Sequence, residues 1–230
     1  MSDRHLARAR ALLERIPLVD GHNDLPYVMR QDSTARGDVA AFGLDRAHQG
    51  YDTDIPRLRE GRVGGQVWAA FCPSNQPEPT RFTLELIQSI RALNALHPDV
   101  FLPALRASDV AKAKRQGKIA SFIGVESGIG IGDRLEMLDI FHALGARVMT
   151  LCHNETLDWV DSATDEPRHD GLTDFGREVV RRMNRLGLLV DMAHTSPKAM
   201  HDVLDVTTAP VSITHANARA LCDHPRNVVD

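Results

Sequence analysis

The sequence has few cysteines and no long apolar run, and both shortages limit what the chain can be. The three cysteines, Cys72, Cys152 and Cys222, are too few for a disulfide framework and have no C-x-x-C spacing, which fits a reducing cytoplasm. No apolar run reaches the roughly 20 residues of a membrane span. The start of the chain lacks the apolar core of a secretory signal, and its end forms no lipid-anchor signal. We therefore expect a cytoplasmic protein without a membrane partner.

The sequence also lacks the signatures of several common enzyme and binding classes. A net charge of −4 and a pI of about 6.2 give no basic excess for binding nucleic acid. No G-x-S-x-G motif supplies a serine nucleophile, and Gly128, Gly130 and Gly132 do not have the G-x-G-x-x-G spacing of a dinucleotide-binding turn. With 43% hydrophobic and 25% charged residues, the 230-residue chain has an ordinary globular composition. It is long enough for one large domain or two small ones.

Apolar strands alternate with amphipathic helices along most of the chain. The apolar spacing and the capping residues Thr173 and Ser196 predict helices over 3–15, 80–97, 108–117, 133–144, 174–186 and 197–204. Short apolar runs predict strands at 16–19, 64–71, 118–126, 146–153, 188–194 and 209–215. Residues 30–62 are polar and irregular, and we expect a long loop over an active site there.

This alternation predicts an α/β fold with a parallel sheet. Metal-capable side chains follow strand after strand: His22, Asp24, Glu126, His153, His194 and His215. A (β/α)8 TIM barrel places its chemistry at the carboxyl ends of its strands, and we therefore predict this fold. A doubly wound sheet is the alternative, although it would gather its site at one switch point.

The residues at the strand ends suit a pair of divalent transition ions, and zinc is the first choice. Glu126 can bridge two ions, with His22 and Asp24 completing the site of one and His194 and His215 that of the other. A water acidified by two cations would be the nucleophile. A single histidine at a strand end is more often structural, but five matching residues argue for a metal site. The remaining histidines lie in loops or helices and are expected to have no chemical role: His5, His48, His97, His142, His169, His201 and His224.

Several ordered motifs resemble the membrane dipeptidases, also called renal dipeptidases. The first is Asp20-Gly-His-Asn-Asp-Leu-Pro26, and the resemblance covers about residues 14–230. Later matches are Gly124-Val-Glu126-Ser-Gly, Leu151-Cys-His153-Asn154, His169-Asp-Gly-Leu-Thr-Asp-Phe-Gly176, Val190-Asp-Met-Ala-His194, Thr214-His215-Ala and Pro225-Arg226-Asn-Val. The resemblance implies a metal-dependent hydrolase barrel, with residues 1–230 as a single partial domain, that hydrolyses dipeptides with two zinc ions.

The resemblance also implies a role for each matching residue. His22 and Asp24 bind one zinc, Glu126 bridges both and takes part in catalysis, and His194 and His215 are the later ligands. His153 would polarise the scissile carbonyl and contact the substrate, and Arg226 would hold the substrate carboxylate. The substrates are dipeptides, including those with a C-terminal D-residue. The sequence does not determine the oligomeric state, and a homo-oligomer is one of the alternatives.

Two departures from the family bear on catalysis. Thr214 stands where many relatives carry serine, a change that we expect to matter little. The sequence shows six barrel strands and no match to the aspartate of the eighth. We therefore expect a fragment that is incomplete for catalysis although its metal ligands are complete. The alternatives are a non-catalytic metal-binding remnant and another amidohydrolase, but the latter usually opens with His-x-His and uses a modified lysine as the bridge.

Overall fold

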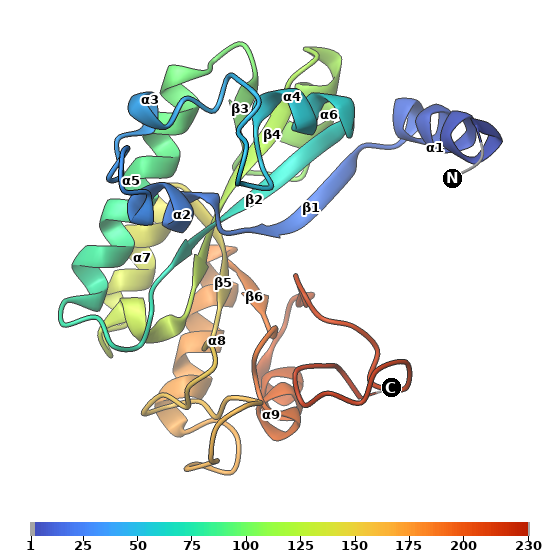
Figure 1. Cartoon of the computed structure of the whole chain (residues 1–230). Helices are drawn as coiled ribbons and strands as arrows, with labels where there is room; N and C mark the ends of the chain where they lie inside the picture. Colours follow the sequence, from blue (N-terminus) through green and yellow to red (C-terminus); the bar gives the residue numbers. More distant parts are fainter. Residues whose placement is uncertain (1–2, 230) are drawn as a thin grey trace. The chain divides into compact units, whose positions relative to one another are not determined.

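The computed structural model describes residues 3–229, which belong to two compact units (Figure 1). Unit 1 comprises the residues up to 68 and residues 88–122, and unit 2 comprises residues 69–87 and those from 123 onward. Six strands form one sheet in the order β1-β2-β4-β5-β6, with β3 paired to β4. The pairings of β1 with β2, β3 with β4, β4 with β5 and β5 with β6 are parallel. The predicted fold class, an α/β TIM-barrel type with about six of its eight strands, is confirmed.

Unit 1 begins with a helix and the first strand. Its elements are α1 (Asp3–Arg15), β1 (Leu18–Asn23), α2 (Leu25–Gln31), α3 (Val39–Phe42), α4 (Ile55–Glu60), β3 (Phe101–Pro103) and α6 (Ser108–Arg115). The side chain of Arg62 ties α1 to this unit by donating to the carboxylate of Glu14 at 2.7 Å and to the Arg10 carbonyl at 3.1 Å. In the core, Trp68 Nε1 donates to Ser121 Oγ at 3.0 Å, so the buried indole has a polar partner.

Three elements have residues in both units, namely β2 (Val63–Phe71), α5 (Pro79–Leu96) and β4 (Ile119–Glu126). Unit 2 also contains η1 (Gly128–Ile131), α7 (Glu136–Ala143), β5 (Ala146–Thr150), α8 (Asp174–Leu186), β6 (Leu189–Asp191) and α9 (Pro197–Val206). An ion pair between Asp139 and Arg182 joins α7 to α8. The helices α7 and α8 pack beside β5 and β6, so the ends of these strands are held in place (Figure 1).

Two helix starts match the sequence prediction closely. Thr173 is the N-cap of α8, and its hydroxyl accepts a hydrogen bond from the Gly176 amide. Ser196 is the N-cap of α9 and accepts from the Ala199 amide, with Pro197 in the first turn. Both side chains satisfy an amide that the helix itself leaves without an acceptor.

Two expected elements differ in the structure, and one strand was not expected. Residues 30–62 contain α3 and α4 instead of one irregular loop, because Asp38 and Asp54 cap two short helices. Residues 209–215 form only an isolated bridge, between Asp191 and Ser212, where a sixth strand was expected. The strand that brings the sheet to six is β3, and its three residues are too few to show a pattern.

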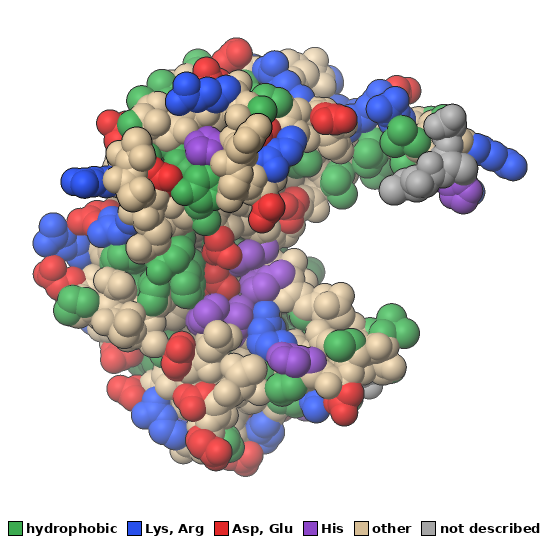
Figure 2. Space-filling view, in the orientation of Figure 1, with side chains coloured by type: hydrophobic (Ala, Val, Ile, Leu, Met, Phe, Trp, Pro, Cys, Tyr) green, Lys and Arg blue, Asp and Glu red, His purple; other side chains and the backbone are tan. Residues whose placement is uncertain are grey.

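The surface is mixed in charge. Lysine and arginine side chains are interspersed with aspartate and glutamate on the face that Figure 2 shows. The small net charge of −4 therefore does not arise from two large areas of opposite sign on that face. Among residues 3–229, no helix has both the length and the apolar character that crossing a membrane requires.

Candidate metal centre

In unit 1, His22 and Asp24 stand side by side at the end of β1. The pairing of β1 with β2 is irregular between Asp20 and Asn23, and the Asp20 carboxylate accepts the His22 amide at 3.1 Å. Asp24 is the N-cap residue of α2, but its side chain caps no helix amide. Its Oδ2 instead lies 3.5 Å from His22 Nε2. An imidazole nitrogen and a carboxylate oxygen so placed are two adjacent ligand atoms.

In unit 2, the side chains of Glu126, His194 and His215 converge. Glu126 ends β4, and its Oε1 lies 3.1 Å from His194 Nε2 and 3.4 Å from His215 Nε2. The two Nε2 atoms are 2.8 Å apart. The Glu126 and His194 side chains are almost wholly buried, and that of His215 is 27% exposed. One carboxylate oxygen and two ring nitrogens thus surround a single point.

This donor set fits a zinc ion. Ligand atoms bound 2.0–2.2 Å from a tetrahedral zinc lie roughly 3.4 Å from one another, close to the separations of these three atoms. Burial lowers the pKa of His194 to about 4, and Arg226 and His153 add to that effect, whereas Glu126 opposes it. His194 is therefore neutral at pH 7, and a neutral imidazole is the form that binds a metal.

His153 follows β5 and belongs to the same cluster. A ligand atom of His153 lies within 4.8 Å of ligand atoms of Glu126 and His194. Its ring is 4.3 Å from the His194 ring and 4.5 Å from that of Phe71. The neighbouring thiol of Cys152 is wholly buried, and burial raises its pKa, so it packs in the core rather than acting as a nucleophile.

The loop between β5 and α8 holds two of these histidines by their backbone. Ser162 Oγ donates to the His153 carbonyl at 2.8 Å, and the Ala163 amide donates to the His194 carbonyl at 2.8 Å. The buried carboxylate of Asp161 organises this loop, because it accepts the amides of Arg168 and Gly171, each at 2.8 Å. The loop thus supports the site by holding the backbone of His153 and His194.

Arg226 reaches the cluster from the end of the chain. Its Nη2 donates to the His215 carbonyl at 3.1 Å, and its buried Nη1 has no hydrogen-bond partner among residues 3–229. Burial lowers the pKa of Arg226, although the charges of Glu126, Cys152 and Asp191 oppose that change. A buried guanidinium nitrogen without an acceptor can receive the carboxylate of a ligand.

Two residues of the site have backbone angles that favour glycine. Ser127, directly after Glu126, has φ +75°, and His194 has φ +71°. Such conformations are uncommon for residues with a Cβ and are concentrated at functional sites. At both positions the chain turns sharply after a strand, and the turn after β6 sets the direction of the His194 side chain.

The sequence analysis assigned no role to Asp191, although this residue lies next to the site. Asp191, the last residue of β6, is wholly buried and accepts hydrogen bonds from the hydroxyls of Thr150 and Thr214. The available signal was an acid inside the apolar run Leu188-Leu-Val-Asp191, since buried strands seldom carry an unpaired charge.

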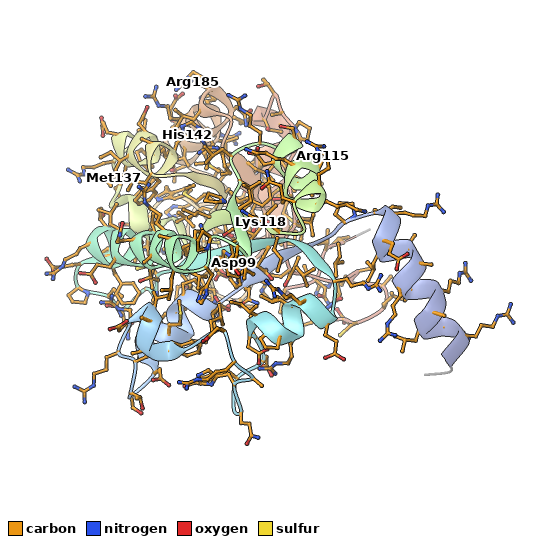
Figure 3. All side chains as sticks on the ribbon, turned by 90° about the horizontal axis from the view of Figure 1, so that it is seen from above. Asp99, Arg115, Lys118, Met137, His142 and Arg185 are labelled. Carbon is orange, nitrogen blue, oxygen red and sulfur yellow. The ribbon has the colours of Figure 1, made fainter. Side chains whose placement is uncertain are left out.

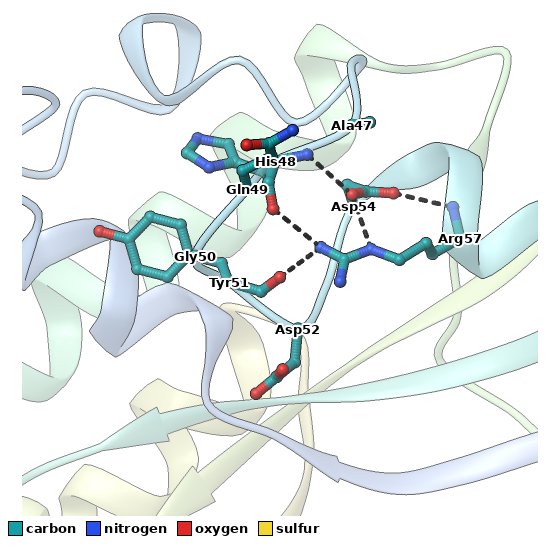
Figure 4. Close-up of a pocket in the computed structure, with 8 residues that line it drawn as sticks. All are labelled: Ala47, His48, Gln49, Gly50, Tyr51, Asp52, Asp54 and Arg57. Atoms are coloured by element: carbon teal, nitrogen blue, oxygen red, sulfur yellow. Dashed lines mark hydrogen bonds and ion pairs between the residues drawn. The ribbon is translucent and has the colours of Figure 1, made fainter.

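A separate pocket lies in unit 1 and has a structural explanation (Figure 4). The wholly buried carboxylate of Asp54 accepts the amides of His48 and Arg57 at 2.9 and 2.8 Å and the Arg57 Nε at 2.7 Å. The Arg57 guanidinium also donates to the carbonyls of His48 and Tyr51. The main charged groups of this pocket therefore satisfy one another and hold the loop before α4.

Replacing Asp54 by asparagine is expected to destabilise the fold at neutral pH. Burial alone would raise the pKa of Asp54, but the hydrogen bonds from His48 and Arg57 lower it overall. A lowered carboxyl pKa contributes stability above its unfolded value, and that stability is lost as the pH falls through the folded value. Asp54→Asn should cost about 1–3 kcal/mol, a fall of roughly 2–10 °C in the melting temperature at pH 7.

Thermal melts of the wild type and the variant from pH 7 to pH 2.5 test this expectation. The difference between the two should shrink below pH 3.8, the ordinary pKa of an aspartate. Asp52→Asn is the control, because Asp52 is an exposed carboxylate that lines the same pocket. A melting temperature of Asp54→Asn equal to that of the control would contradict the structural role.

Comparison with known proteins identifies the family. The model of the membrane dipeptidase family, Peptidase family M19, matches residues 6–230. The chain belongs to this family. An uncharacterised dipeptidase of Schizosaccharomyces pombe, also similar to this chain, is 37% identical over 238 residues. That match covers 97% of this chain and 57% of the yeast protein, so the chain spans little more than half the length of this relative.

Solved structures similar to this M19 chain agree in fold. The probable dipeptidase PvdM from Pseudomonas aeruginosa is 25% identical, with a TM-score of 0.84 over 99% of this chain and 59% of its own. A metallopeptidase from Rhodobacter sphaeroides, solved with a phosphinate mimic of the dipeptide L-Ala-D-Ala, is 24% identical, with a TM-score of 0.77 over 93% of this chain and 68% of its own. At this identity, the similarity to the Rhodobacter sphaeroides protein shows a shared fold.

Proposed function

We propose that this chain is the metal-binding part of a dipeptidase that hydrolyses the peptide bond of dipeptides with two zinc ions. The observation that carries the proposal is the convergence of Glu126, His194 and His215. In this proposal Glu126 bridges both ions, His194 and His215 complete the site of one, and His22 and Asp24 bind the other. Membership of a metallopeptidase family supports a metal cofactor, and the paired His22 and Asp24 support the second ion.

Different residues of the site would position the water, stabilise the reacting carbonyl and bind the substrate carboxylate. Bound zinc ions acidify a water and polarise a carbonyl oxygen. Glu126, whose oxygen faces both histidine nitrogens, would hold the two ions in register and so place the water that they activate. His153 stands beside His194 and can donate a hydrogen bond to the scissile carbonyl as negative charge develops on its oxygen. Arg226 can bind the terminal carboxylate of the dipeptide in a bidentate pair.

The proposed substrates are dipeptides with free ends, including those with a C-terminal D-residue. The Rhodobacter sphaeroides structure holds a phosphinate mimic of L-Ala-D-Ala, and a dipeptide phosphinate is therefore a suitable probe for this chain. Calorimetry should show that the zinc-loaded protein binds the phosphinate and that the metal-free protein does not. Equal binding by both forms, or none by either, would contradict the proposed function.

Metal analysis gives a direct test of the metal content. After zinc loading and gel filtration, elemental analysis of the protein should find about two zinc ions per chain. Treatment with a chelator should remove both ions, and their loss should lower the melting temperature because the metal binds only the folded state. A loaded protein that contains no zinc would overturn the assignment of the site.

Two further parts of the proposal concern the setting of the protein. Cys72, Cys152 and Cys222 are all free thiols, which supports a cytoplasmic location. We also propose that residues 1–230 form a single domain of the hydrolase barrel type, since the family match runs from residue 6 to residue 230. The proposed partner is a small dipeptide, and neither nucleic acid nor a membrane is part of the proposal.

A further inference from the structure

A buried carboxylate lies beneath the histidine cluster and is surrounded by donors. Asp191 Oδ2 accepts the hydroxyls of Thr150 and Thr214 at 2.6 and 2.7 Å, and its Oδ1 accepts the Thr214 amide at 2.8 Å. The Ala193 amide and the Ser212 hydroxyl approach the same Oδ1 at 3.4 Å. Asp191 has no exposed surface, and within the described residues 3–229 its carboxylate makes no direct hydrogen bond to a histidine ring. Its influence on the site therefore passes through the side chains bound to it.

Thr214 connects this carboxylate to His215. Its Oγ1 is 2.7 Å from Asp191 Oδ2 and 2.9 Å from His215 Nδ1. A threonine hydroxyl has one proton to donate, and an ionised carboxylate can only accept. The hydroxyl proton is therefore directed to Asp191, and the same oxygen accepts the proton on His215 Nδ1.

This arrangement of hydrogen bonds selects one tautomer of the neutral His215 ring. A neutral imidazole with its hydrogen on Nδ1 has a lone pair on Nε2. That Nε2 is the atom that faces Glu126 Oε1 and His194 Nε2. In the metal-free protein, the hydrogen between the two rings then belongs to His194, whose Nε2 is also within reach of the carboxylate of Glu126. The lone pair of His215 points to the place where a metal ligand is needed.

We propose that Asp191, acting through the hydroxyl of Thr214, is a positioning residue that fixes the tautomer and the ring orientation of His215. The inference rests on the proposed function, because it treats His215 as a metal ligand. Hydrogen bonds of this kind behind a ligating histidine commonly change metal affinity by about 10- to 100-fold.

The chain offers a matched control for this relay. Thr150 donates to the same oxygen of Asp191, at nearly the same distance as Thr214, but in the described part of the chain no hydrogen bond joins the Thr150 hydroxyl to a histidine. Valine at either position has nearly the shape of threonine and removes one hydrogen bond to Asp191. Only valine at position 214 also removes the acceptor of His215 Nδ1–H.

The experiment compares Thr214→Val, Thr150→Val and Thr214→Ser in the full 230-residue chain. Zinc affinity is measured by competition with a chromophoric chelator, and stability by thermal melts. We expect Thr214→Val to weaken the binding of one zinc ion by about 10- to 100-fold. Thr214→Ser should bind zinc like the wild type, and Thr150→Val should lower the melting temperature without changing zinc affinity. Equal zinc affinities for the two valine variants would overturn the proposal.

A second measurement separates this inference from the proposed function. Nitrogen-15 NMR of the metal-free protein reports which ring nitrogen of His215 carries the hydrogen. The wild type and Thr214→Ser should show the hydrogen on Nδ1, and Thr214→Val should show a mixture of the two tautomers. A wild type that binds no zinc would contradict the proposed function while leaving the relay testable by this spectrum. A wild-type His215 with its hydrogen on Nε2 would refute the relay itself.

Discussion

Replacing Glu126 by glutamine is expected to abolish the binding of at least one zinc ion and to weaken the other by more than about 100-fold, a larger loss than changes behind a ligand cause. The variant keeps the shape of the side chain but removes the negative charge that lies against His194 Nε2 and His215 Nε2. An amide oxygen is a much weaker ligand for zinc than a carboxylate. Since Glu126 is the proposed bridge, both ions lose a ligand, and any hydrolysis of dipeptides by the chain should be lost as well.

His142→Gln is the control for this experiment. His142 lies on α7, on the same helix as Met137 (Figure 3). Burial and the charge of Arg147 lower its pKa, although the charge of Asp139 opposes them, and His142 belongs to neither group of candidate metal ligands within the described residues. Zinc content measured by elemental analysis should stay at about two in this control and fall to one or less in Glu126→Gln. Two tightly bound zinc ions in Glu126→Gln would exclude Glu126 as the bridging ligand.

Replacing Arg226 by methionine should weaken the binding of a dipeptide phosphinate by about 10- to 150-fold, which corresponds to the loss of one charged hydrogen-bonded pair of about 1.5–3 kcal/mol. The buried Nη1 has no hydrogen-bond partner within the described chain, and in the proposal it donates a hydrogen bond to the substrate carboxylate. Arg226→Lys should recover only part of the affinity, because an ammonium keeps the charge but cannot form the bidentate pair. Calorimetry on zinc-loaded protein measures both changes.

The same experiment needs a control for indirect effects on the metal. Arg226 Nη2 donates to the carbonyl of His215, so zinc content must be measured beside phosphinate affinity. Arg219→Met is the matched variant, because Arg219 lies in the same terminal segment but pairs with the exposed Asp223 at 3.0 Å. Unchanged phosphinate affinity in Arg226→Met, with full zinc content, would show that the carboxylate is bound elsewhere.

Local sequence signals predicted much of the fold because they act within a few residues. Thr173 and Ser196 cap α8 and α9 as expected, since the interaction of an N-cap side chain with the third amide is purely local. The helix ending at Leu96 was visible from its regular apolar spacing over 18 residues. The short helices α3 and α4 were missed because each is shorter than two turns.

The candidate site was predictable to the extent that strand ends are predictable. Glu126 ends a strand of eight residues, and the approach of its side chain to His194, which follows β6, is expected from the parallel pairing of β4 with β5 and of β5 with β6. The segment before His215 is not a strand, and its geometry depends on the hydrogen bonds of Ser212 and Thr214 to β6 and Asp191. Those contacts join residues more than 20 positions apart, which composition and periodicity cannot reveal.

The backbone at Ser127 and His194 has a consequence for how this sequence can vary. At φ values of +75° and +71°, each residue adds about 1–3 kcal/mol of conformational strain that glycine would relieve. Selection for stability and selection for chemistry therefore favour different residues at position 194, where only the imidazole serves the site. A change to glycine there would relax the turn and remove a ligand at once. Stabilising substitutions elsewhere in unit 2, far from the cluster, would offset the strain at His194 and so allow the chain to keep this histidine.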